Sequence, residues 1–232
     1  IINRDKFTVI REKKTEELDW PEALSGKASF PHHMLKEIME QPSTIADTLR
    51  GRLLWEEGTS RLGGIEHDFE SLLYARRIVL TACGTASHAG MVGRILIERI
   101  ARIPAVMEIA SEFRYSDPIL EENTVVLSIS QSGETADTLA AMEESRNKGA
   151  LCWSIVNVIG SQAMRLADGT ISMQCGPEIG VASTKAFTSQ VTVLSLMTLL
   201  LARMTSMSAS RGRDVRRIPA ARHPGCPARR TE

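Results

Sequence analysis

The chain has 232 residues, of which 43% are hydrophobic and 24% charged, and its 28 Lys and Arg balance its 28 Asp and Glu. This length allows one domain with flanking segments and provides ample apolar material for a core. The balanced charge argues against nucleic-acid or membrane partners, and the 4% aromatic content argues against a base-stacking surface. Four widely spaced cysteines match neither a disulfide framework nor a zinc site, which indicates a reduced, cytoplasmic setting.

We expect the first 71 residues to form linker-like structure. Residues 1–30 read as a short strand (Lys6–Arg11) and a charged linker, the remnant of a preceding domain, and Ile1 as the start of a piece cut from a longer polypeptide. Residues 31–71 read as a helical linker segment. One helix is expected from Pro31 to Pro42, and a second is expected to begin at Ser43 as its N-cap.

Residues 72–205 alternate apolar, β-branched runs with helical stretches. Near-continuous apolar runs between amphipathic helices predict parallel strands covered on both faces. We therefore expect an α/β fold, a three-layer αβα sandwich with a mostly parallel five-stranded, flavodoxin-like sheet. The expected strands are Ile78–Ala82, Ala105–Ile109, Thr124–Ile129, Leu151–Val156 and Gly169–Met173, and the expected helices are Ser87–Ile103, Glu112–Tyr115, Thr135–Asn147, Ser161–Ala167 and Ser183–Met204.

The sequence also predicts the structure of two further stretches, an apolar run and the C-terminal tail. The longest apolar run, Val191–Ala202, is too short for a membrane span of about 20 residues and predicts a buried helix. Residues 206–232 hold seven Arg, three Pro and no periodicity, so we expect a disordered or non-native tail, such as a frameshift after about Met204 would produce. A basic arm for nucleic acid is the less favoured interpretation of this tail.

In doubly wound sheets, ligands bind beyond the carboxyl ends of the strands. The turn after the first predicted strand begins Cys83-Gly84-Thr85 and matches neither the dinucleotide nor the P-loop pattern. Gly84 allows a ligand to approach the backbone closely. Cys83 is either a nucleophile or, as we favour, a small structural residue. His88 faces either the ligand or, as we favour, the solvent.

The turn after the third predicted strand, Ser130-Gln131-Ser132-Gly133-Glu134-Thr135, carries the strongest signal. Three hydroxyls and an amide cluster where a strand leads into a helix, which suits a phosphate dianion at the helix N-terminus. The alternative is an ordinary N-cap by Ser132, which leaves the other polar side chains unexplained. Glu134 counts mildly against a phosphate site unless its carboxylate points away.

The third candidate turn runs over residues 176–185, before the last helix of the domain. Its Glu178 and Lys185 form either an acid/base pair or an exposed structural pair. His32 and His33 have no partner ligands at a metal spacing, so we expect no metal and no cofactor.

Three segments, ACGTASHAG, SISQSGETADT and GPEIGVASTKAFTSQ, resemble the first sugar-isomerase (SIS) domain of the glutamine–fructose-6-phosphate aminotransferase family. The segments FPHHMLKEIMEQP and IASEFRY resemble that family's linker and its second strand-end turn. The family makes glucosamine 6-phosphate and glutamate from fructose 6-phosphate and glutamine, in hexosamine biosynthesis. The resemblance covers about residues 5–205.

The resemblance implies a binding site for a phosphorylated hexose, fructose 6-phosphate or glucosamine 6-phosphate, and a homodimer. The implied substrate-binding residues are Cys83, Gly84, Thr85, Ser130, Gln131, Ser132, Thr135, Val181 and Ser183. The family has Ser where this chain has Ala86, a loss of one hydroxyl contact. In the family, a glutaminase domain and a second isomerase domain supply the catalytic groups, so we assign no catalytic residue here and expect little activity from this chain alone. The alternative function is a stand-alone SIS module that senses a sugar phosphate.

Overall fold

The computed structural model describes residues 2–4, 7–9, 26–205 and 207–214. Strands β1 (Ile2–Arg4) and β2 (Phe7–Val9) pair antiparallel. The strand predicted over residues 6–11 is present at its centre as β2, and its ends lie outside the described residues.

Five strands form one parallel sheet in the order β6-β5-β7-β8-β9, and every pairing between neighbours is parallel. This order is that of a flavodoxin-like doubly wound sheet, so the predicted fold class is confirmed. The strands agree with the predicted runs to within one residue at either end. They are β5 (Arg77–Ala82), β6 (Ala105–Ile109), β7 (Thr124–Ser130), β8 (Leu151–Val156) and β9 (Gly169–Ser172).

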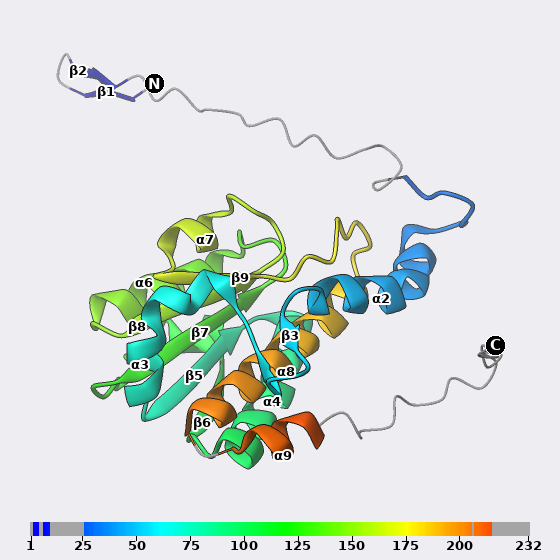
Figure 1. Ribbon diagram of the computed structural model, residues 1–232. Helices are drawn as coiled ribbons and strands as arrows, with labels where there is room; N and C mark the ends of the chain where they lie inside the picture. The colour runs from blue at the N-terminus through cyan, green and yellow to red at the C-terminus, as the bar shows by residue number, and fades with distance from the viewer. Residues whose placement is uncertain (1, 5–6, 10–25, 206, 215–232) are drawn as a thin grey trace.

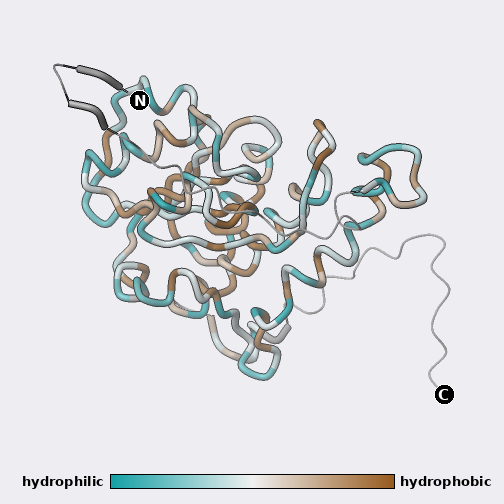
Figure 2. The backbone as a smooth tube through the Cα atoms, turned by 90° about the horizontal axis from the view of Figure 1, so that it is seen from above, coloured by the Kyte–Doolittle hydropathy of each residue, from teal (hydrophilic) through white to brown (hydrophobic). Residues whose placement is uncertain are grey.

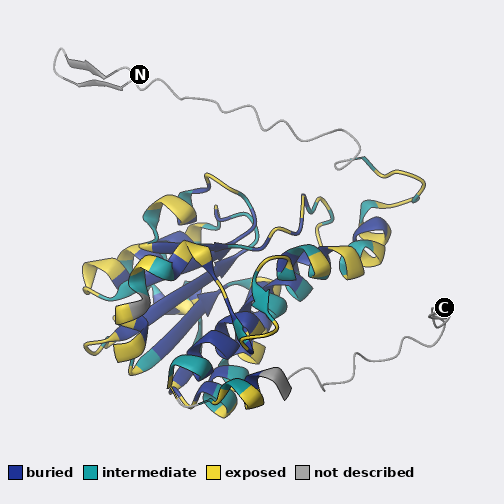
Figure 3. Cartoon of the chain, viewed as in Figure 1, coloured by how far each residue is buried: buried dark blue, intermediate teal, exposed yellow. Residues whose placement is uncertain are grey.

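Helices cover both faces of the sheet (Figure 1). Alternate residues of β5 enter different layers: Ile78 and Leu80 pack with α4 and α8, whereas Val79 packs with α5 and α6. The buried strands lie between helices whose outer surfaces are exposed (Figure 3), and hydrophobic segments gather in the interior (Figure 2). The covering helices are α4 (Gly84–Leu96) with its π-helical extension η2 (Ile97–Ala101), α5 (Ala110–Phe113), α6 (Ala136–Asn147), α7 (Gln162–Leu166) and α8 (Lys185–Thr205).

Helix α8 is long and apolar enough to cross a membrane by length and composition, but 72% of its most apolar window is buried inside the protein. Val193, Met197 and Leu201 are fully buried in the main core. The apolar run therefore forms a core helix, as predicted.

The two helices predicted on either side of Pro42 are one helix, α2 (His33–Leu49). Pro42 lacks the N–H that would donate to the carbonyl of Ile38, and the side-chain amide of Gln41 donates to that carbonyl instead, at 3.0 Å. Ser43 is not an N-cap, because its hydroxyl donates to the carbonyl of Glu40 at 2.7 Å. Because Gln41 satisfies the carbonyl of Ile38, α2 continues past the proline.

Between α2 and β5 lie a short hairpin, β3 (Leu53–Leu54) and β4 (Thr59–Ser60), the 3-10 helix η1 (Gly63–Asp68) and helix α3 (Phe69–Tyr74). Ser60 attaches the hairpin to α8, because its hydroxyl donates to the carbonyl of Leu196 at 2.6 Å. Sequence analysis did not identify this hairpin.

The expectation of a structureless segment from residue 206 is wrong for helix α9 (Ala209–Asp214). Gly212 is buried, and a side chain there would overlap the carbonyl of Gly58. Helix α9 therefore packs by close backbone approach at a glycine, without the apolar stripe whose absence prompted the prediction.

Candidate functional site

The carboxyl ends of β5 and β7 form the switch point of the sheet. Ala82 of β5 pairs with Ile129 of β7, so the turns that follow these strands leave the sheet side by side. The chain then enters α4 on one face and α6 on the other, so both helix N-termini lie at the same end of the sheet, where doubly wound sheets bind ligands. The sheet therefore brings together the first two predicted turns.

The loop Ser130–Thr135 gathers its hydroxyls by hydrogen bonds within itself. The amide of Gly133 donates to Ser130 Oγ at 3.0 Å, and the amide of Glu134 donates to Ser132 Oγ at 3.2 Å. Ser130 Oγ also lies 3.4 Å from Thr135 Oγ1. Ser130 is buried, whereas Gln131, Ser132 and Thr135 are half-buried and accessible to a ligand.

Gly133 is required by the conformation of this loop. Its φ is +67°, in the left-handed region, and a Cβ there would overlap the side chain of Ser161. The carbonyls of Gln131 and Gly133 accept hydrogen bonds from the amides of Asn157 (3.1 Å) and Ala163 (2.9 Å). The loop is thus held against the segments that follow β8.

Ser132 does not cap α6. That helix begins at Ala136, its N-cap is Thr135, and the Ser132 hydroxyl accepts a hydrogen bond inside the loop instead. Glu134 turns its carboxylate to the start of α7, where Oε1 accepts a hydrogen bond from the amide of Gln162 at 2.8 Å. The polar cluster therefore exceeds what an N-cap needs, and its one acidic side chain is engaged elsewhere.

The turn after β5 presents Gly84 and Thr85 on the surface, with Cys83 half-buried. Gly84 has φ +58°, and α4 begins there. Ala86 is buried, and the hydroxyl of Ser87 donates to the carbonyl of Gly84 at 2.6 Å. The Ser87 hydroxyl is therefore engaged within the first turn of α4. His88 is exposed, as we favoured from the sequence.

The third turn is arranged around Glu178. Its Oε1 accepts hydrogen bonds from the amides of Thr184 (2.8 Å) and Ala186 (3.1 Å), and its Oε2 accepts one from Ser183 Oγ (3.0 Å). Glu178 thus caps α8, while Lys185 is buried and pairs with Glu40 at 2.7 Å. Both readings of a Glu178–Lys185 pair are therefore wrong, because each side chain has a different structural partner.

Asn157 links the second and third turns, and sequence analysis missed it. Its amide bonds to the carbonyl of Gln131, its Nδ2 donates to the carbonyl of Gly176 at 2.6 Å, and its Oδ1 accepts from the amide of Cys175 at 3.1 Å. The start of the 176–184 segment therefore lies beside the hydroxyl-rich loop. Val181, farther along that segment, is fully exposed, and Ser183 is half-buried. The only available signal was a polar residue directly after a buried strand.

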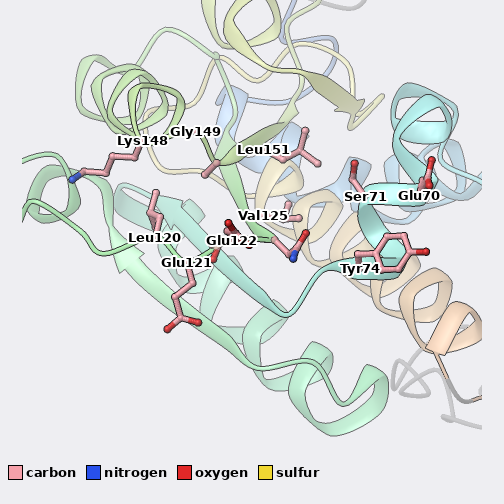
Figure 4. A pocket seen from close by; sticks show the side chains of 13 residues that line it. Glu70, Ser71, Tyr74, Leu120, Glu121, Glu122, Val125, Lys148, Gly149 and Leu151 are labelled. Carbon is pink, nitrogen blue, oxygen red and sulfur yellow. The ribbon is translucent and has the colours of Figure 1, made fainter.

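A hollow of about 440 Å³ lies at the opposite edge of the sheet (Figure 4). Thr124 and Leu151, the first residues of β7 and β8, line it together with Glu70 and Tyr74 of α3. It is therefore separate from the turns at the carboxyl ends.

Residues 71–200 match the family model of the SIS domain. The isomerizing glutamine–fructose-6-phosphate aminotransferase of Chlorobaculum tepidum is 46% identical over 214 residues, which are 90% of this chain and 35% of that enzyme. The enzyme of that name from Bacteroides thetaiotaomicron is 52% identical over 177 residues, 76% of this chain and 29% of the enzyme.

Among solved structures, the C-terminal domain of glucosamine-fructose-6-phosphate aminotransferase from Francisella tularensis has a TM-score of 0.76 and 38% identity. The match covers 82% of this chain and 53% of that one. The chain thus spans about a third of the length of the enzymes that it matches. The resemblance predicted from the motifs is confirmed. Since the family model covers more than half of the residues, the chain belongs to the SIS domain family.

Proposed function

We propose that this chain is the sugar-phosphate-binding part of an isomerizing glutamine–fructose-6-phosphate aminotransferase. The ligand is a phosphorylated hexose, fructose 6-phosphate or its product glucosamine 6-phosphate. The relatives that carry this name cover most of the chain, and their name describes an enzyme that acts on fructose 6-phosphate.

The loop Ser130–Thr135 carries the proposal. It places three hydroxyls, the left-handed turn at Gly133 and the N-terminus of α6 at the switch point of the sheet. The loop contains no Lys or Arg, so the phosphate would be held by neutral donors and by the helix dipole. Ser130, Gln131, Ser132 and Thr135 would bind the phosphate.

The sugar would lie between the other two turns. Cys83, Gly84 and Thr85 follow β5 at the switch point, and the 176–184 segment is joined to the phosphate loop through Asn157. The backbone at Val181 and the side chain of Ser183 would contact the sugar. We assign no general base, imine-forming amine or nucleophile among these residues. The 232 residues by themselves would therefore bind the phosphosugar with little turnover.

Calorimetric titration with fructose 6-phosphate tests the proposal, with unphosphorylated fructose and fructose 1-phosphate as comparison ligands. We expect binding of fructose 6-phosphate and none of fructose. Absence of binding at millimolar fructose 6-phosphate and fructose 1-phosphate alike would overturn the proposed function. A ligand-dependent change in the binding of a macromolecular partner, without any role in amino-sugar synthesis, would favour the regulatory module instead.

A further inference from the structure

A buried carboxylate of α2 holds the segment that follows Glu178. Glu37 is 2% exposed, and its Oε1 accepts hydrogen bonds from the amides of Ile179 (2.6 Å) and Gly180 (3.0 Å). Its Oε2 accepts a second bond from the Gly180 amide at 3.2 Å. Hydrogen bonds from amides to an ionised carboxylate are stronger than neutral ones, so this contact fixes the backbone at residues 179–180.

Glycine at position 180 allows this close contact. A Cβ there would lie 2.5 Å from Glu37 Oε2 and 3.5 Å from the Cα of Met34, so a side chain would displace either the Glu37 carboxylate or the segment from its place. The close approach and the carboxylate are therefore two parts of one junction.

A second carboxylate, one helical turn further along α2, holds the other end of the segment. Glu40 Oε2 accepts a hydrogen bond from Lys185 Nζ at 2.7 Å, and Lys185 is 3% exposed at the first residue of α8. Glu40 also lies 3.6 Å from Lys36 Nζ. The residues between the two anchors, 181–184, include the fully exposed Val181 and the half-buried Ser183.

We propose that Glu37 and Glu40 are positioning residues for the sugar-contacting segment. They act through the 179–180 backbone and through Lys185, without touching the ligand. This inference rests on the proposed function, because it assigns the contacts of Val181 and Ser183 to the sugar. A segment fixed at both ends before binding loses little conformational freedom when the sugar arrives, so the anchors raise affinity for the sugar and not for the phosphate.

The test compares two ligands on one variant. Glu37→Gln keeps the size of the side chain and one acceptor oxygen, but it removes the negative charge and places an NH₂ donor where Oε2 accepts the 3.2 Å bond. We expect fructose 6-phosphate to bind about 10-fold more weakly, the lower end of the range for a charged hydrogen bond because Glu37 acts through the backbone, and inorganic phosphate to bind within about twofold of the parent chain. Asp47→Asn is the matched control, because Asp47 is a half-exposed carboxylate at the far end of α2 that pairs with Arg50.

Gly180→Ala supplies the same test from the loop side and leaves the carboxylate intact. Equal loss for both ligands in both variants, or no loss for either, would overturn the positioning role. Hydrogen exchange over residues 176–186 is the readout that needs no ligand: we expect faster exchange in Glu37→Gln than in Asp47→Asn. Unchanged exchange would refute the inference even if the chain binds phosphosugar. If the parent chain binds no phosphosugar, the proposed function fails, while faster exchange would still establish the anchor.

Discussion

Replacing Ser132 and Thr135 together by Ala separates ligand binding from folding. In the free protein these hydroxyls contribute little to stability, because the Ser132 bond to the Glu134 amide is 3.2 Å long at the surface and Thr135 Oγ1 lies 3.4 Å from its neighbour. Long, solvent-accessible neutral hydrogen bonds are worth at most about 0.5–1 kcal/mol each. The double variant should therefore unfold within a few degrees of the parent chain.

Binding should respond far more strongly. A hydrogen bond to a charged group is worth about 1.5–3 kcal/mol, so two bonds to a phosphate dianion predict a loss of about 100-fold or more in affinity for fructose 6-phosphate. Calorimetry and a thermal melt on the same sample measure both quantities, with Thr192→Ala/Ser195→Ala on α8 as the control that also removes two hydroxyls. Parallel losses of affinity and stability would mean that the loop is only a structural cap. Unchanged affinity would mean that the phosphate binds elsewhere.

Three further outcomes are expected. Ala86→Ser should tighten phosphosugar binding by about 0.5–1.5 kcal/mol in calorimetry if its hydroxyl reaches the ligand, and equal affinity would show that it does not. Burial raises the pKa of the Cys152 thiol to about 12 and that of Cys175 to about 11, whereas unfolded thiols titrate near 8.5. The unfolded state therefore releases these protons first, and stability should fall above about pH 9 by up to about 1.4 kcal/mol per thiol per pH unit. A Cys152→Ala/Cys175→Ala chain should have a flatter melting profile between pH 8 and 10, and an identical slope would contradict the assignment. Finally, Met91 and Ile95 expose an apolar stripe on α4, so we expect self-association in light scattering that Met91→Lys/Ile95→Lys reduces; a monomeric parent chain at high concentration would refute this.

The sheet can be predicted from the sequence because its strands are short, mostly apolar runs, buried on both faces in β5, β7 and β8. Such runs are distinct from the helices around them, and the carboxyl ends follow directly from the strand limits. The phosphate-loop candidate is therefore located by pattern alone. Its internal geometry is also local, since the bonds of Ser130 and Ser132 join residues two or three positions apart.

The predictions that failed concern contacts that sequence rules do not describe. Pro42 remains inside α2 because Gln41 satisfies the orphan carbonyl, which no proline rule anticipates. Lys185 pairs with a residue 145 positions away, and Glu37 accepts bonds from amides 142 and 143 positions away. Spacing within one turn cannot identify such partners, so the sequence names the polar residues of the third turn but not what they contact.

The chain's own carboxylates limit where an external anion can bind. Glu178 occupies the N-terminus of α8, and Glu134 occupies that of α7. Helices α4 and α6 begin at the N-caps Cys83 and Thr135, and neither of these side chains makes a capping bond. These two helix ends flank the switch point, and their unsatisfied amides carry partial positive charge. A dianion placed at α7 or α8 would meet a carboxylate that accepts hydrogen bonds at the helix end, whereas the acidic residue in the first turn of α6, Asp137, pairs with Arg114 at 2.9 Å. The carboxylates at α7 and α8 therefore disfavour an anion at those two helix ends, and the switch point that the hydroxyl-rich loop marks remains available.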